Sequence, residues 1–293
     1  MPEILGKDTI ERVDRPEAMS FREKLARTAE TNRSLLCVGL DPDPSRIPED
    51  AIAEYLVSIV EATSDLVCAY KPNLAFYEQL GERGYAALRA VLRAIPAGIP
   101  TIADAKRGDV GHTAEAYARA IYDELGFDAC TVTPYVGGDG VEPFAMRADR
   151  GVLIVCRTSN PGAPDLQDLQ VGGPDGPRPL YEAVAEMARR WNTHGNVGLV
   201  TGAPYPAEMR RLRELCPDMP FLIPGIGPQR GDLVEAVRAG LDANGGGIIV
   251  NASRSVLYAG TGADAAGAAR REAARLREAI EEQRTAVRAG LRS

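Results

Sequence analysis

Residues that build metal sites and disulfide frameworks are scarce in this chain. Among its 293 residues are only two histidines and five cysteines, and no two cysteines form a Cys-x-x-Cys pair. Zinc sites and disulfide scaffolds normally need such clusters. We therefore expect the cysteines to be small, reduced core residues, and we predict neither a metal nor a cofactor.

Long apolar runs and an excess of basic residues are missing as well. The first residues are charged, and no apolar run reaches the ~18 residues of a membrane helix, so we expect no secretion signal, no membrane partner and a cytoplasmic location. The 41 acidic residues outnumber the 34 basic ones, for a net charge of −7. Nucleic-acid binding normally needs a basic face, so no nucleic-acid partner is expected.

What the chain does have is a repeating alternation of short apolar and longer amphipathic segments. The apolar segments, rich in Val, Ile and Ala, predict eight strands at Ser34–Leu40, Leu66–Lys71, Ile99–Lys106, Ala129–Pro134, Gly151–Arg157, Val197–Gly202, Phe221–Gly225 and Gly247–Asn251. The amphipathic segments predict helices at Glu49–Ala62, Leu74–Ala94, Thr113–Leu125, Leu180–Trp191, Pro206–Leu215 and Asp232–Ala239, with a weaker signal at Val141–Ala148. Such alternation indicates parallel βαβ units in a sheet covered on both faces.

Eight repeats in a chain of this length favour a closed (β/α)8 TIM barrel, with an open doubly wound sheet as the alternative. We expect a single domain over residues 21–293, preceded by a polar extension at residues 1–20. Two flanking helices are predicted, from Phe21 to Glu30 and from Ala265 to Arg292, the latter a charged surface helix. Asn160–Pro179 is dense in Gly, Pro and Asp and predicts a long loop of the kind that often serves as an active-site lid.

Charged residues follow three successive predicted strands, at the barrel end where catalytic groups normally lie. Asp41 follows the first strand, Lys71 ends the second, and Asp104 and Lys106 end the third. Asp104 and Lys106 are two residues apart, so strand alternation predicts that they share a face. Charged side chains confined inside a barrel need partners of opposite charge. An alternating array of carboxylates and ammonium groups would keep the lysines protonated and the carboxylates ionised.

A phosphate site is predicted beyond the seventh and eighth strands, where this fold usually binds phosphate through backbone N–H groups. Gly227 and Gln229 follow the seventh strand, and Ser253 and Arg254 follow the eighth. Arg254 could add a charge-assisted pair of hydrogen bonds. Ser159 and its neighbours after the fifth strand could read a polar base edge, or could simply begin a turn.

Several short motifs resemble, in the same order, those of orotidine 5′-monophosphate decarboxylases, in the form found in the second, mainly bacterial subgroup of that family. The resemblance spans about residues 21 to 260. Its motifs are Gly-Leu-Asp-Pro at 39–42, Tyr-Lys-Pro-Asn at 70–73, Asp-Ala-Lys-Arg-Gly-Asp at 104–109, Thr-Pro-Tyr at 133–135, Ser-Asn-Pro-Gly at 159–162 and Pro-Gly-Ile-Gly at 224–227.

The resemblance implies decarboxylation of orotidine 5′-monophosphate to uridine 5′-monophosphate, the last step of de novo pyrimidine biosynthesis. Lys106 would protonate C6, Asp104 would flank the substrate carboxylate, and Lys71 and Asp41 would contact the ribose. In a homodimer with shared active sites, Asp109 and Thr113 would reach the neighbouring subunit's site. Ser159 would contact the pyrimidine, and Gln229 and Arg254 the phosphate.

Three other functions compete with this one. A Schiff-base aldolase would use Lys71 or Lys106 as nucleophile, but that needs an amine with a lowered pKa, which neighbouring carboxylates would oppose. The 3-keto-gulonate phosphate decarboxylase branch of the same barrel uses magnesium, so a chelator would distinguish it. A nucleotide-binding protein without activity is the third possibility.

Overall fold

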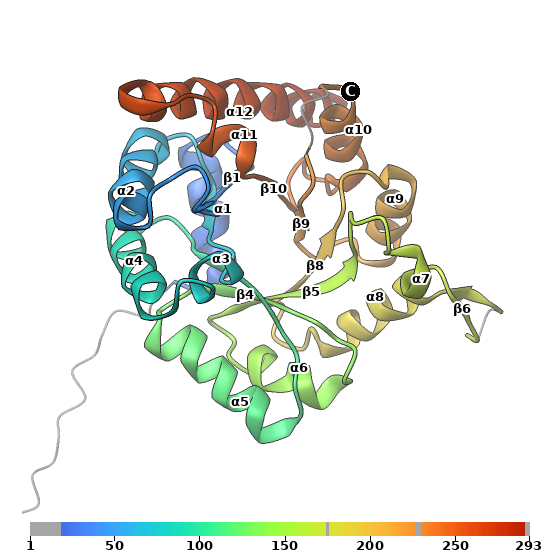
Figure 1. The fold of residues 1–293 in the computed structure, drawn as a ribbon. Helices are drawn as coiled ribbons and strands as arrows, with labels where there is room; N and C mark the ends of the chain where they lie inside the picture. Colours follow the sequence, from blue (N-terminus) through green and yellow to red (C-terminus); the bar gives the residue numbers. More distant parts are fainter. Residues whose placement is uncertain (1–18, 174–175, 227–229, 291–293) are drawn as a thin grey trace, which may run out of the picture.

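Eight parallel strands close into a barrel in the computed structural model, which describes residues 19–173, 176–226 and 230–290 (Figure 1). Their order around the sheet is β2-β1-β10-β9-β8-β5-β4-β3, and the bridges Tyr70↔Thr101 and Asn73↔Asp104 join the two ends. The strands are β1 (Leu36–Gly39), β2 (Ala69–Lys71), β3 (Ile102–Arg107), β4 (Ala129–Val132), β5 (Gly151–Arg157), β8 (Val197–Thr201), β9 (Phe221–Ile223) and β10 (Ile248–Ala252). The predicted closed barrel is confirmed.

Helices surround the strands, as Figure 1 shows. They are α1 (Phe21–Thr31), η1 (Glu49–Ala51), α2 (Ile52–Thr63), α3 (Ala75–Glu78), α4 (Gly81–Ala94), α5 (Gly111–Arg119), η2 (Ala120–Glu124), α6 (Gly138–Ala145), α7 (Pro164–Gln167), α8 (Leu180–Trp191), α9 (Pro206–Leu215), α10 (Arg230–Gly240), α11 (Arg254–Leu257), η3 (Gly262–Asp264) and α12 (Ala265–Gly290). The helix predicted over Leu74–Ala94 is divided into α3 and α4, because Gly81 adopts a φ of +59° that a regular helix does not allow.

Burial explains why these segments fold as they do. Helix α2 buries Ile52, Leu56, Ile59 and Val60, a helical stripe that packs into the hydrophobic core. Every residue of β1 is buried, as expected for a strand covered on both faces. All five cysteines are free and buried, as predicted.

Two predictions, one about the C-terminal helix and one about the segment at 160–179, need correction. Helix α12 is not a solvated surface helix: it packs against α2 and α10 and buries seven apolar residues together with Arg284, so it belongs to the helical layer of the barrel. The segment predicted as an irregular loop over Asn160–Pro179 contains α7 and a small hairpin of β6 (Gln170–Val171) and β7 (Arg178–Pro179), which lies at the periphery beside α8 (Figure 1).

The polar extension falls almost entirely on residues 1–18, outside the described part of the chain.

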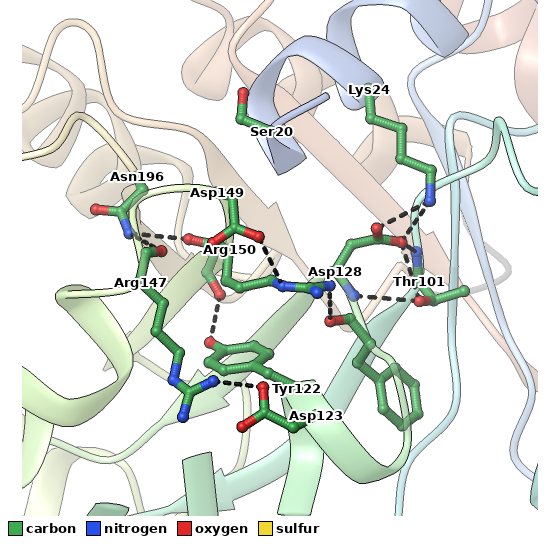
Figure 2. Close-up of polar contacts among 12 residues, drawn as sticks. Ser20, Lys24, Thr101, Tyr122, Asp123, Asp128, Arg147, Asp149, Arg150 and Asn196 are labelled. Atoms are coloured by element: carbon green, nitrogen blue, oxygen red, sulfur yellow. Dashed lines mark hydrogen bonds and ion pairs between the residues drawn. The ribbon is translucent and has the colours of Figure 1, made fainter. Parts of the chain in front are cut away.

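A polar network closes the N-terminal end of the barrel (Figure 2). The ammonium of Lys24 on α1 pairs with Asp128 at 2.8 Å, and Asp128 also accepts from the backbone N–H and hydroxyl of Thr101. Nearby, the side-chain amide of Asn196 donates to the carbonyls of Ala145, Arg147 and Arg150. Interactions at the N-terminal end of a TIM barrel contribute to stability, and catalytic groups normally lie at the opposite, C-terminal end. Within the described residues, no helix is both long and apolar enough to cross a membrane.

Candidate active site

A cavity of about 610 Å³ opens at the C-terminal end of the barrel, where β1, β2, β3, β9 and β10 end. Its lining includes Asp41, Lys71, Asp104, Ser253 and Arg254, five residues that the sequence placed in the site. A larger groove of about 850 Å³ lies between α12 and the turn after α1, but its charged side chains are exposed or half-buried surface groups. The strand-end cavity is the candidate site because it alone of these two contains buried charges.

Three charged groups at this end of the barrel form a chain of ion pairs centred on Asp104. Asp104 and Lys71 line the cavity, whereas Lys106 is not among its lining residues. The two carboxylate oxygens of Asp104 lie 2.7 Å from the Lys71 ammonium and 2.5 Å from the Lys106 ammonium. The side chains of Lys71 and Asp104 are only 3% and 11% exposed, whereas that of Lys106 is 50% exposed. Lys106 is therefore the more accessible of the two ammonium groups that pair with Asp104.

The electrostatics agree with the predicted array. Burial alone would raise the pKa of Asp104, but the ammonium groups of Lys71 and Lys106 outweigh it and lower that pKa to about 2. Burial opposes the charge of Lys71, yet Asp104 and Asp41 raise its pKa above the ordinary value. At neutral pH the site thus contains an ionised Asp104 and a protonated Lys71.

The local conformation of β3 brings Asp104 and Lys106 together in a way that strand alternation did not predict. The β3–β4 ladder is regular up to Ala103↔Cys130 and resumes at Arg107↔Val132, so three β3 residues lie opposite the single residue Thr131. Lys106 has a φ of +45°, the left-handed region that non-glycine residues rarely adopt. The two charged side chains meet as predicted, but across a bulge rather than along a regular strand.

Thr131 is a site neighbour that the sequence analysis missed. Its hydroxyl accepts from the N–H groups of Ala105 and Lys106 and donates to Asp104 Oδ1. The only signal in the sequence was its place near the end of the fourth predicted strand. A threonine in an apolar strand otherwise resembles any buried β-branched residue.

Asp41 and Ser253 both lie close to Gly39, at the end of β1. Asp41 Oδ1 accepts from the backbone N–H of Asn73 at 3.0 Å. A methyl group added to Gly39 would lie 1.8 Å from Ser253 Oγ and 3.2 Å from Asp41 Oδ2. A glycine at the end of β1 is thus what lets the loop after β10 approach Asp41 so closely.

Part of the predicted phosphate site is present in the described chain. Arg254 begins α11, is exposed, lines the cavity and forms no ion pair with a described residue. Gly227 and Gln229 lie outside the described residues. Ser159 lies at the same end of the barrel, because atoms of Ser159 stand 2.9–3.0 Å from methyl groups added to Gly202 and Gly225.

Asp109 and Thr113 are not part of the array within one chain. Asp109 lies in the β3–α5 turn, where its carboxylate accepts from the N–H of Val110 at 2.8 Å. Thr113 lies in the first turn of α5 and is half-buried. Neither is among the residues that line the described cavity. No group of three or more metal-ligating side chains occurs within the described residues.

A sequence model of the orotidine 5′-phosphate decarboxylase / HUMPS family matches residues 34–269, a span that contains every strand of the barrel. The chain belongs to this family. Two members named orotidine 5′-phosphate decarboxylase, from Roseiflexus sp. and Thermomicrobium roseum, are each 53% identical to it. The match with the first covers 89% of this chain and 97% of the relative, and the match with the second 92% and 98%.

Solved structures of orotidine 5′-phosphate decarboxylase family members share the architecture. The Leishmania donovani OMP decarboxylase is 44% identical, with a TM-score of 0.81, and the match covers 91% of this chain and all of that one (100%). The enzyme from Methanocaldococcus jannaschii, complexed with the inhibitor BMP, has a TM-score of 0.63 at 22% identity over 84% of this chain and 97% of its own. At that identity the likeness is one of fold.

Proposed function

We propose that this protein decarboxylates orotidine 5′-monophosphate to uridine 5′-monophosphate and carbon dioxide, the last step of de novo pyrimidine biosynthesis. The observation that carries the proposal is the chain of ion pairs from Lys71 through Asp104 to Lys106 at the mouth of the barrel. Membership of the decarboxylase family, at 53% identity to named enzymes, supports the same reaction.

The chemistry needs a fixed positive charge beside C6. When the bond between C6 and the carboxylate breaks, its electron pair stays on C6 as a carbanion in the plane of the ring. The Lys106 ammonium stabilises that charge and then transfers a proton to C6, and the resulting amine regains a proton from solvent. A preorganised ammonium is effective because it needs no reorganisation as charge develops.

Asp104 has two tasks in this scheme. Its ion pairs hold the ammonium groups of Lys71 and Lys106 in place, at 2.7 and 2.5 Å. Because its pKa is about 2, it remains ionised throughout the physiological range and would also face the departing carboxylate. We assign Lys71 and Asp41 to the ribose, and Ser159 to the pyrimidine.

The phosphate would bind at the other side of the cavity. Arg254 and Ser253 support this assignment, since both line the cavity and Arg254 has no carboxylate partner among the described residues. We include Gln229 and Gly227 in the phosphate site on the basis of the motif. Binding energy from a remote phosphate can hold the substrate ring in place for reaction at C6.

We further propose a homodimer in which Asp109 and Thr113 complete the neighbour's site. An exposed apolar patch, formed by Val110, Tyr135 and Val136, supports this interface. Asp109 lies within the patch, because a methyl group added to Gly140 would approach both the Asp109 carbonyl and the Val136 side chain. Exposed apolar side chains that gather in one region favour an interaction site. We place the protein in the cytoplasm, in keeping with its five free cysteines.

The raised pKa of Lys71 argues against a Schiff-base aldolase, since the nucleophilic amine would be scarce at neutral pH. The remaining alternative in the family is a magnesium-dependent decarboxylase of a sugar phosphate. Both the reaction and the role of magnesium can be tested in one experiment.

The experiment follows the loss of orotate absorbance when purified protein is mixed with orotidine 5′-monophosphate and excess chelator. We expect turnover that survives the chelator and falls by several orders of magnitude in Lys106→Ala. Arg46→Ala, which removes a cation at the rim of the same cavity, serves as a matched control and should retain far more activity. A correctly folded protein without turnover would refute the proposal, and loss of turnover with the chelator would point to the magnesium-dependent branch.

A further inference from the structure

The backbone at Lys106 is held in a conformation that needs support. Its φ of +45° is in the left-handed region, which is unfavourable for a side chain with a Cβ atom. Such residues persist only where the surrounding structure holds them, and they concentrate at functional sites. The question is which group supplies the restraint at this position.

The bulge in β3 also removes ladder partners from the backbone. Between Ala103↔Cys130 and Arg107↔Val132, the N–H groups of Ala105 and Lys106 have no β4 carbonyl opposite them. Both donate instead to the Thr131 hydroxyl, at 3.0 and 2.9 Å. One side-chain oxygen thereby accepts hydrogen bonds from two consecutive backbone N–H groups, which gives both donors a partner within the bulge.

The same hydroxyl is also tied to the carboxylate of the site. Having accepted two N–H groups, it donates its own proton to Asp104 Oδ1 at 3.1 Å, the oxygen that lies 2.5 Å from the Lys106 ammonium. Thr131 is thus linked to both ends of the Lys106 residue: directly to its backbone, and through Asp104 to its ammonium.

We propose that Thr131 is a positioning residue that holds Lys106 in its left-handed conformation and so aims the ammonium at the reacting carbon. This role rests on the proposed decarboxylase function. Thr131 is only 1% exposed and its hydroxyl is engaged in hydrogen bonds to β3, so we expect it to position Lys106 rather than to contact the substrate. Its loss should therefore lower kcat while leaving substrate binding nearly unchanged.

Thr201 on β8 provides a matched control. It is also a threonine that is 1% exposed near the C-terminal end of a strand, but its hydroxyl has no hydrogen-bond partner among the described residues. Replacement of either threonine by valine changes one buried hydroxyl for a methyl group. Only the Thr131 replacement removes hydrogen bonds to the catalytic segment.

The test measures kcat and KM for orotidine 5′-monophosphate in Thr131→Val and Thr201→Val. Because a displacement of about 1 Å can slow an enzyme roughly 100-fold, we expect kcat to fall roughly 10- to 100-fold in Thr131→Val, with KM within about threefold. Thr201→Val should keep the kcat of the wild type. Hydrogen exchange of the peptide that contains Lys106 should be faster only in Thr131→Val.

A second pair of variants covers the case in which Thr131→Val does not fold. Thr131→Ser and Thr131→Ala both lack the methyl group and differ only in the hydroxyl, so the serine variant should retain activity that the alanine variant loses. Equal kcat values within this pair, or a loss confined to KM, would overturn the positioning role. An inactive wild type would overturn the proposed function first, whereas an active wild type with an equally active Thr131→Val would overturn only the role of Thr131.

Discussion

Replacing Asp104 by asparagine should destabilise the folded protein by a predictable amount. Lowering the pKa of this carboxyl from 3.8 to about 2 corresponds to about 2.4 kcal/mol of folding free energy at neutral pH. Breaking a buried ion pair can cost ~3–5 kcal/mol when the remaining charge loses its partner. Here Asp41 still favours the Lys71 ammonium, so we expect Asp104→Asn to lose about 2–3 kcal/mol.

The sign of the pH dependence follows from the direction of the shift. The folded pKa of Asp104 lies below the unfolded one, so its contribution is complete above the unfolded value and is lost as pH falls toward 2. The difference between wild type and Asp104→Asn should therefore be constant from about pH 5 to 8 and roughly half as large at pH 3. The pKa of Lys71 is raised, so its contribution disappears only at high pH, outside this window.

Urea unfolding followed by circular dichroism at pH 7, 4 and 3 measures the free energy of unfolding of both proteins. Asp50→Asn is a suitable control. Asp50 is exposed in η1, so this substitution removes the same charge from the protein surface. If Asp104→Asn were as stable as the wild type at pH 7, or if the difference were the same at pH 3, the assignment of a strongly coupled buried carboxylate would be wrong.

Two further predictions concern ligand binding and assembly. Arg254→Ala should weaken the binding of uridine monophosphate roughly 10- to 100-fold, because a charge-assisted hydrogen bond to the phosphate is lost. Calorimetry should show unchanged binding of uridine, which has no phosphate. An equal loss for both ligands would place Arg254 outside the phosphate site. Asp109→Asn and Lys106→Ala should each be nearly inactive, yet an equal mixture that exchanges subunits should regain about a quarter of wild-type activity, since each mixed dimer contains one intact site. A mixture no more active than its components would show that Asp109 acts within its own chain.

Strand positions and the identity of the charged residues were accessible from the sequence because they depend on local patterns. Apolar runs of Val, Ile and Ala predicted all eight barrel strands. The predicted ends of three of these strands contain the site residues Asp41, Lys71, Asp104 and Lys106. In a parallel barrel all strand ends of one kind lie on one rim. The topology of the barrel therefore places these residues on one rim.

Other features depended on contacts between distant segments. The sequence of α12 is charged and rich in alanine, and nothing local distinguishes a surface helix from one whose alanines pack on α2 and α10. The segment at 160–179 has too many Gly and Pro residues for a periodic signal, yet it forms α7 and a short hairpin. Asp109 and Thr113 were named by their motif, but one chain alone does not bring them into the cavity.

The sequence by itself determined which chemical groups stand at the end of each strand, because the order of residues and the strand period are local properties. Only the tertiary structure decided how those groups meet. The bulge opposite Thr131 and the left-handed backbone of Lys106 arise from the pairing of β3 with β4. That pairing, and the burial that lowers the pKa of Asp104, exist only when residues far apart in the chain have packed together.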